Sequence, residues 1–177
     1  MKLIDMYNLV VKKGLEKDPR SRAEIKEELD KSKLEYRKLK GVDRKAFDVE
    51  RLRNPYSDTR ILYGNPDTDV KTVIVGIDME APEIIAADRL NEKGECIDLV
   101  LAHHPEGAAW SRLHDVMHLQ VAMLKRFGIS HDVAEHLLKD RMGEVERAIA
   151  PANHFRSVDM ARLLDIPFMC VHTPADN

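Results

Sequence analysis

Two apolar segments of this 177-residue chain each end directly on side chains that can bind a metal ion. The segment 99–102 runs into His103 and His104, and the segment 168–171 runs into His172, with Asp176 four residues later. Imidazole nitrogens and carboxylate oxygens together suit zinc, iron, manganese or nickel, and these residue types do not select among them. The chemistry indicated is that of a divalent metal site.

Both segments have the pattern of buried parallel strands, which are short apolar runs separated by helical stretches. Functional side chains of open α/β sheets gather at the carboxyl ends of such strands, so we expect His103, His104, His172 and Asp176 to meet in one crevice. Neighbouring side chains of an extended chain point to opposite faces. His103 and His104 therefore share a centre only if the backbone turns after them or if two metals lie on either side. The alternative is that one of them packs and the other is solvated.

Other polar residues are candidates for supporting roles. His114 and His118 are spaced one helical turn apart, but the sequence HDVMH lacks the glutamate of a metalloprotease helix, so we predict a polar helix face and leave a supporting role open. Asp78 ends an earlier strand and either faces the crevice or caps the next helix. Glu106 is a candidate for proton transfer. No catalytic residue and no organic cofactor site is assigned.

The elements that must position these residues are predicted from hydrophobic periodicity and turn signals. An N-terminal helical segment spans 1–41, with a capping box formed by Ser21 and Glu24, and an α/β metal-binding region spans 42–177 in the same domain. The predicted fold class is α/β, with a mostly parallel or mixed sheet flanked by helices. Strands are expected at 60–63, 72–78, 97–102 and 168–171, and further helices at 81–90, 111–127, 133–149 and 155–164.

Composition excludes several classes of protein. The hydrophobic fraction of 44% suits a globular domain, and the formal net charge of −3 lacks the basic excess of a nucleic-acid-binding protein. The first 18 residues carry charges throughout, unlike a signal peptide, and no apolar run approaches the ~20 residues of a membrane span. We therefore expect a cytoplasmic protein without nucleic-acid or membrane partners. The two cysteines form no CxxC pair, so a thiolate site is not predicted.

Three sequence elements resemble a known family. The strand with its HHP at 99–105, the VIVGID strand at 73–78 and the VHTPAD segment at 171–176 are similar to the first half of the NGG-interacting factor three-like proteins, also known as GTP cyclohydrolase type-two homologues. The resemblance extends from about residue 71 to the C-terminus. It implies an α/β protein that binds a pair of divalent metals and assembles into a homo-oligomer, a hexamer in the family. His103 and His104 match the family's HH ligands, and His172 and Asp176 match its HxxxD ligands.

The sequence departs from that family in two ways. The family completes its site with a histidine and an acidic residue from a C-terminal half, whereas this sequence stops at Asn177. The segment 106–167 is also longer than in compact members. We therefore expect a truncated domain that lacks the C-terminal half.

The function expected from these residues is divalent metal binding with dinuclear metal-dependent hydrolysis of a nucleotide or related small molecule. Two metals about 3.5–4 Å apart activate water near neutral pH and polarise phosphoryl or carbonyl oxygens. The alternative from a different class is a non-catalytic metal or cofactor carrier, or a regulatory binding protein, because a fold does not determine a reaction. A third interpretation is an unrelated metallophosphoesterase that would recruit ligands from other strand ends, Asp78 foremost.

Overall fold

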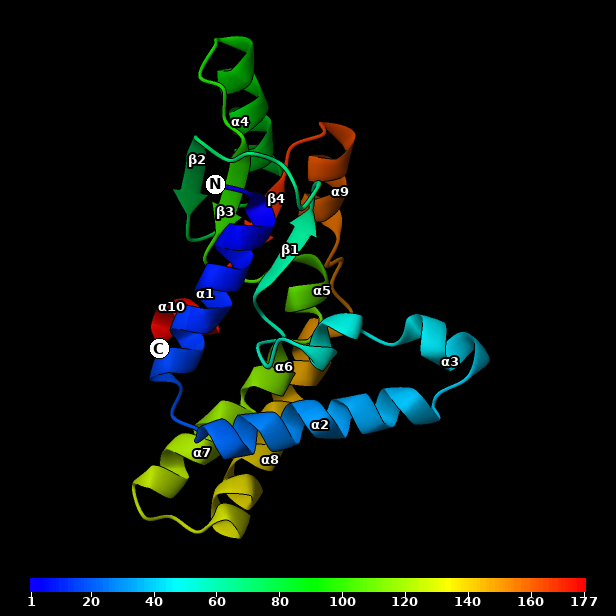
Figure 1. The fold of residues 1–177 in the computed structure, drawn as a ribbon, viewed down its shortest axis with the longest axis vertical. Helices are drawn as coiled ribbons and strands as arrows, with labels where there is room; N and C mark the ends of the chain where they lie inside the picture. Colours follow the sequence, from blue (N-terminus) through cyan, green and yellow to red (C-terminus); the bar gives the residue numbers. More distant parts are fainter.

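The computed structural model describes residues 1–177 and contains one four-stranded mixed sheet in the order β1-β4-β3-β2 (Figure 1). Strands β2, β3 and β4 are mutually parallel, and β1 runs antiparallel to β4. The predicted α/β class with a mixed, helix-flanked sheet is thus confirmed. The strands are β1 (Arg60–Tyr63), β2 (Val73–Gly76), β3 (Leu99–Ala102) and β4 (Phe168–Cys170).

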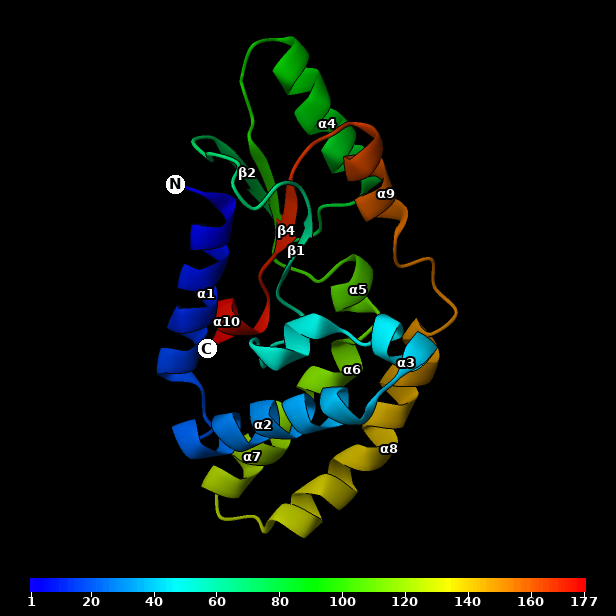
Figure 2. The ribbon, with the colours of Figure 1, turned by 45° about the vertical axis from the view of Figure 1, so that its right-hand side comes forward.

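Alternate side chains of the two central strands supply two separate hydrophobic cores, as the two-residue period of a strand requires. Val100 and Phe168 pack with helices α4 (Ala81–Glu92) and α9 (Arg156–Leu163) on one face. Leu99 and Met169 pack with helix α1 (Leu3–Lys17) on the other. All four side chains are fully buried or nearly so. Figure 2 shows α1 on one side of the sheet and α4 and α9 on the other.

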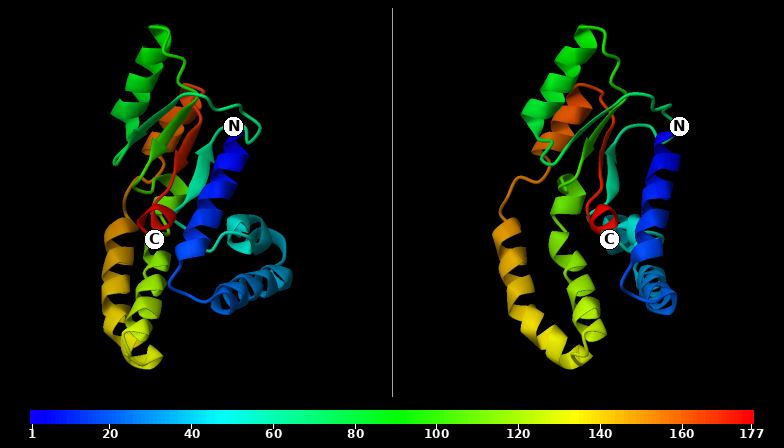
Figure 3. Two further views of the ribbon diagram at one scale, coloured as in Figure 1. Left: turned by 60° about the vertical axis from the view of Figure 1, so that its left-hand side comes forward. Right: turned by 90° about the vertical axis from the view of Figure 1, so that its left-hand side faces the viewer.

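The remaining helices form a layer beyond the end of the sheet at which β3 and β4 terminate (Figure 3). Helix α2 begins at the predicted capping box, in which Ser21 accepts from the Glu24 amide and Glu24 accepts from the Ser21 amide. None of the helices is both long and apolar enough to cross a membrane. The helices of this layer are α2 (Arg22–Lys38), α3 (Gly41–Ala46), η1 (Val49–Leu52), α5 (Gly107–Trp110), α6 (Leu113–Val116), α7 (His118–Arg126) and α8 (His131–Ile149).

The single helix predicted over 111–127 is wrong, because the segment from Gly107 onward divides into α5, α6 and α7. The first break lies at Arg112, whose backbone leaves the helical region (φ −117°, ψ 18°), and the second lies at Met117, between α6 and α7. The Arg112 guanidinium donates to Asp48 and Asp115. The ion pair with Asp48 joins residues 64 apart in the chain, so a local helical pattern cannot reveal it, and tertiary contacts of this kind can override local helix propensity.

Candidate metal centre

Three imidazoles lie together at the carboxyl edge of the sheet. His103 and His104 follow β3, and His172 follows the adjacent parallel strand β4, so the parallel pairing of those two strands brings the side chains to one edge. One ring nitrogen from each residue lies within 4.8 Å of the others. The His103 and His172 rings stack with centroids 4.9 Å apart, and the His104 ring lies 5.3 Å from that of His103. We call these residues the histidine cluster.

The backbone explains how two consecutive histidines reach one centre. The amides of His103 and His104 donate to the carbonyls of Gly76 and Ile77, both at 2.9 Å, so pairing with β2 continues past the end of β3. The chain then turns at Glu106 and Gly107, where Gly107 adopts a φ of +57°. A turn after the two histidines is one of the two conditions that the sequence analysis set for a shared centre.

Asp176 joins the cluster through one turn of helix. His172 precedes helix α10 (Thr173–Asp176), which places residues 172 and 176 on the same helical face. The Asp176 carboxylate lies 3.6 Å from Nε2 of His103 and 3.9 Å from Nε2 of His172. Ligand atoms of a tetrahedral zinc ion with bonds of 2.0–2.1 Å are separated by about 3.4 Å. The Asp176 contacts are therefore within a few tenths of an ångström of that spacing, whereas the ring nitrogens, up to 4.8 Å apart, would have to close by roughly an ångström around one ion.

Each ring of the histidine cluster has its Nδ1 engaged by an oxygen acceptor. His103 Nδ1 donates to the carbonyl of Val171 (3.1 Å), His104 Nδ1 to Asp78 (2.7 Å) and His172 Nδ1 to Asp58 (2.9 Å). Carbonyl and carboxylate oxygens only accept, so the proton of each neutral ring resides on Nδ1. The lone pair is then on Nε2 in all three rings. This is the arrangement of metal-binding histidines.

Asp58 contacts the histidine cluster and is a residue that the sequence analysis missed. It lies in the segment before β1 to which no role was assigned, and its side chain is fully buried. The hydrogen bond to Asp58 raises the pKa of His172, and the burial of the ring opposes this only in part. No local pattern points to this pair, because Asp58 and His172 are 114 residues apart in the chain.

Asp78 lies beside the histidine cluster, in agreement with the first of its two predicted alternatives. Its carboxylate accepts from His104, whereas the N-cap of α4 is Glu80, which forms a capping box with Glu83. Both members of the pair between His104 and Asp78 are exposed, by 48% and 69% of their side chains. This pair is therefore the solvent-facing part of the centre.

Glu106 makes no hydrogen bond to the histidine cluster. Its side chain is buried and accepts a short hydrogen bond of 2.5 Å from Ser157, which is fully buried on α9. Burial raises the pKa of Glu106, and the Ser157 hydroxyl opposes that shift. Its contacts are therefore those of a core carboxyl group.

His114 and His118 also lie away from the cluster, on the two separate helices α6 and α7. His114 Nε2 lies 3.4 Å from Asp115, and His118 borders a large groove. Neither belongs to the group of three imidazoles.

That groove has a volume of about 640 Å³ and lies between α2 and the helices α6, α7 and α8. Its wall includes Thr173 but none of the three imidazoles. Basic side chains of the wall are paired with acidic ones, as in the ion pair of Lys125 with Glu24. Cavity size alone therefore does not make this groove the candidate site, which is assigned instead from the donor atoms of the histidine cluster.

Fold and geometry together define an α/β protein with a histidine cluster, able to hold a metal ion, at the carboxyl edge of a mixed sheet. A solved structure of a NIF3 superfamily protein from Sphaerobacter thermophilus is similar to this chain, with a TM-score of 0.62 and 27% sequence identity. The match covers 70% of this chain and 42% of that protein. The chain is thus NIF3-like over the matched part, as its resemblance to the NGG-interacting factor three-like family implies. No family model and no curated protein matches the sequence.

Proposed function

We propose that the chain binds divalent metal ions through His103, His104, His172 and Asp176. The observation that carries the proposal is the common orientation of the three rings, each with Nδ1 held by an acceptor and Nε2 left for a ligand bond. A bound divalent ion would supply a Lewis acid that polarises water and phosphoryl or carbonyl oxygens. The similarity to a NIF3 superfamily protein supports the same proposal.

The donor set divides into two parts, which supports the dinuclear form of the proposal. Asp176 approaches His103 and His172, whereas the nearest carboxylate to His104 is Asp78. His103, His172 and Asp176 form one group of donors, and His104 stands beside it toward solvent. A pair of divalent ions about 3.5–4 Å apart could share these donors.

We further propose that the reaction is metal-dependent hydrolysis of a nucleotide or a related small molecule. In this reaction His103, His104, His172 and Asp176 would hold the ions, and His172 would keep its orientation through Asp58. The exposure of His104 leaves an approach to the centre from solvent. Glu106 is not proposed as the proton-transfer group, because its carboxyl is bonded to Ser157 in the core.

The second candidate function is that of a metal or cofactor carrier or a regulatory binding protein. The burial of Glu106 favours it, because the one carboxyl that was a candidate for proton transfer is engaged elsewhere. Multiple-turnover assays with nucleotide and phosphoester panels, run with each of Zn²⁺, Mn²⁺, Fe²⁺ and Ni²⁺, separate the two functions. Turnover that disappears in His172→Ala supports hydrolysis. Saturable metal binding without turnover of any substrate supports the carrier.

A further inference from the structure

We propose that Asp58 is the positioning residue of the metal centre, holding the His172 ring so that only Nε2 can bind a metal. This inference rests on the proposed metal binding and adds to it a residue that is not itself a ligand. The Asp58 side chain is fully buried, and a buried carboxylate is costly unless hydrogen bonds compensate it. The Thr59 hydroxyl donates to Oδ1 at 3.3 Å, and the donors to Oδ2 come from the segment that carries His172.

Three donors converge on a single oxygen of Asp58. Oδ2 accepts from His172 Nδ1 (2.9 Å), from the Thr173 amide (3.2 Å) and from the Thr173 hydroxyl (2.6 Å). The neighbouring Thr59 holds the backbone of His172 as well, because its hydroxyl accepts from the His172 amide (3.1 Å). Two consecutive residues therefore fix the backbone and the ring of His172, and the ring cannot rotate without breaking its hydrogen bond to the buried Asp58.

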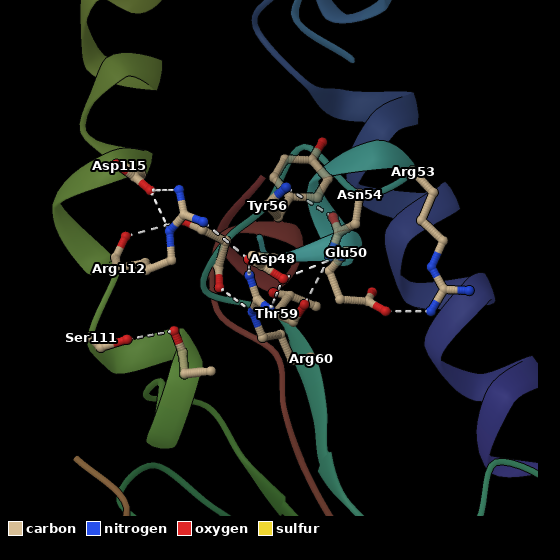
Figure 4. Close-up of polar contacts among 12 residues, drawn as sticks. Asp48, Glu50, Arg53, Asn54, Tyr56, Thr59, Arg60, Ser111, Arg112 and Asp115 are labelled. Atoms are coloured by element: carbon tan, nitrogen blue, oxygen red, sulfur yellow. Dashed lines mark hydrogen bonds and ion pairs between the residues drawn. The ribbon is translucent and has the colours of Figure 1, made fainter. Parts of the chain in front are cut away.

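The segment that carries Asp58 is itself braced (Figure 4). Asn54 donates to the Thr59 carbonyl and accepts from the Tyr56 amide, both at 2.8 Å. The Arg60 guanidinium donates to Asp48, and its Nε donates to the Ser57 carbonyl at 2.9 Å. These bonds fix the positions of Asp58 and Thr59 without a bound metal ion. Such preorganisation is what a metal ligand such as His172 requires.

The corresponding partner of His104 offers an internal comparison. Asp78 also accepts from an Nδ1, but its side chain is 69% exposed and it receives no other hydrogen bond. Water can replace an exposed acceptor and cannot readily replace a buried one. Loss of Asp58 should therefore weaken metal binding more than loss of Asp78.

The test combines Zn²⁺ titration by calorimetry with ¹⁵N NMR of the histidine rings in metal-free protein. In the wild type we expect the neutral His172 ring to be protonated on Nδ1. Asp58→Ala should place part of the proton on Nε2 and weaken Zn²⁺ binding about 10–100-fold. Asp58→Asn should retain the Nδ1 proton, and its affinity for Zn²⁺ should fall less than about 10-fold, because the amide oxygen can take the place of Oδ2. Asp78→Ala should weaken Zn²⁺ binding less than Asp58→Ala does.

A purely structural role would lower the unfolding temperature without moving the ring proton. The proposal is therefore overturned if the wild-type His172 ring is protonated on Nε2, a result that needs no variant to fold. An Asp58→Ala protein that binds Zn²⁺ within about 3-fold of wild type overturns it as well. Failure of the wild type to bind Zn²⁺, Mn²⁺, Fe²⁺ or Ni²⁺ contradicts the proposed function instead. The NMR measurement uses metal-free protein, so its result does not depend on whether a metal binds.

Discussion

At the scale of single residues, the centre depends on which nitrogen of each ring carries the proton. Val171, Asp78 and Asp58 contribute one acceptor each, and these three acceptors direct three lone pairs toward one place. Residue types and spacing were sufficient to predict that these four side chains would lie close together, because His103 and His104 follow β3 and His172 follows β4, with Asp176 one helical turn later. That all four act as ligands stays a prediction.

Replacing Asp176 by Ala should weaken metal binding more than about 10-fold, because an anionic ligand contributes more than an outer partner does. The fold should be preserved to within about 0.5 kcal/mol, since the side chain is 57% exposed. Calorimetric titration and urea unfolding measure the two quantities. Unchanged metal affinity would exclude Asp176 as a ligand.

His104→Ala tests the division of the centre into two parts. If two ions bind, the variant should retain one ion held by His103, His172 and Asp176 and lose the other. Elemental analysis after dialysis gives the ratio of metal to protein. The matched control is His136→Ala, which removes an exposed histidine of α8. An identical ratio in wild type and His104→Ala would contradict the dinuclear form.

At the scale of elements, the sequence predicted the strand ends that carry the histidines, but it did not predict the long-range contacts that hold the neighbouring segments in place. Apolar runs followed by polar residues are local patterns, so β3 and β4 could be placed from sequence. The pairing of Asp58 with His172 spans 114 residues. Arg112, at the helix break, is paired with Asp48, 64 residues away. No local sequence pattern indicates either of these two contacts.

Helix α1 also positions the centre, through the contact of Gly14 with Pro174 of α10. A Cβ at residue 14 would lie 2.8 Å from the Pro174 Cβ and 2.9 Å from its Cα, so α10 would have to move and Asp176 with it. Gly14→Ala should therefore cost about 1–3 kcal/mol of stability and weaken metal binding.

Gly143→Ala is the control for this substitution. Its Cβ would meet only the Arg147 side chain, which can move, and the helix should gain up to about 1 kcal/mol from the change. Urea unfolding and Zn²⁺ titration of both variants check the prediction. Wild-type metal affinity in Gly14→Ala would show that α1 does not influence the centre.

The ion pairs of Asp48 should make stability depend on pH in the acid range. Burial alone would raise the pKa of Asp48, but the bonds from Arg60 and the charge of Arg112 outweigh it and hold the pKa below 3.8. A depressed folded-state pKa contributes stability above the unfolded value, and this contribution is lost as the pH falls through the folded value.

Asp48→Asn should consequently be less stable than wild type by about 2 kcal/mol near neutral pH, with the difference shrinking below pH 4. Urea unfolding at a series of pH values measures it. A difference that stays constant from neutral pH to below pH 4 would show that the charge of Asp48 does not contribute to stability.

At the scale of the whole molecule, metal binding and folding should be linked, because β3, β4 and α10 come together only in the folded chain. An ion at about 100 times its Kd should stabilise the fold by about 2.7 kcal/mol, or roughly 5–10 °C in Tm. Differential scanning calorimetry with and without Zn²⁺ measures the shift. We expect none in a protein carrying both His103→Ala and His172→Ala.

Metal content after equilibrium dialysis tests the central claim most directly. Wild-type protein dialysed against Zn²⁺ or Mn²⁺ should retain at least one ion per chain by elemental analysis. The double variant His103→Ala with His172→Ala should retain none, and His136→Ala should match the wild type. Equal metal content in the wild type and the double variant would contradict the account.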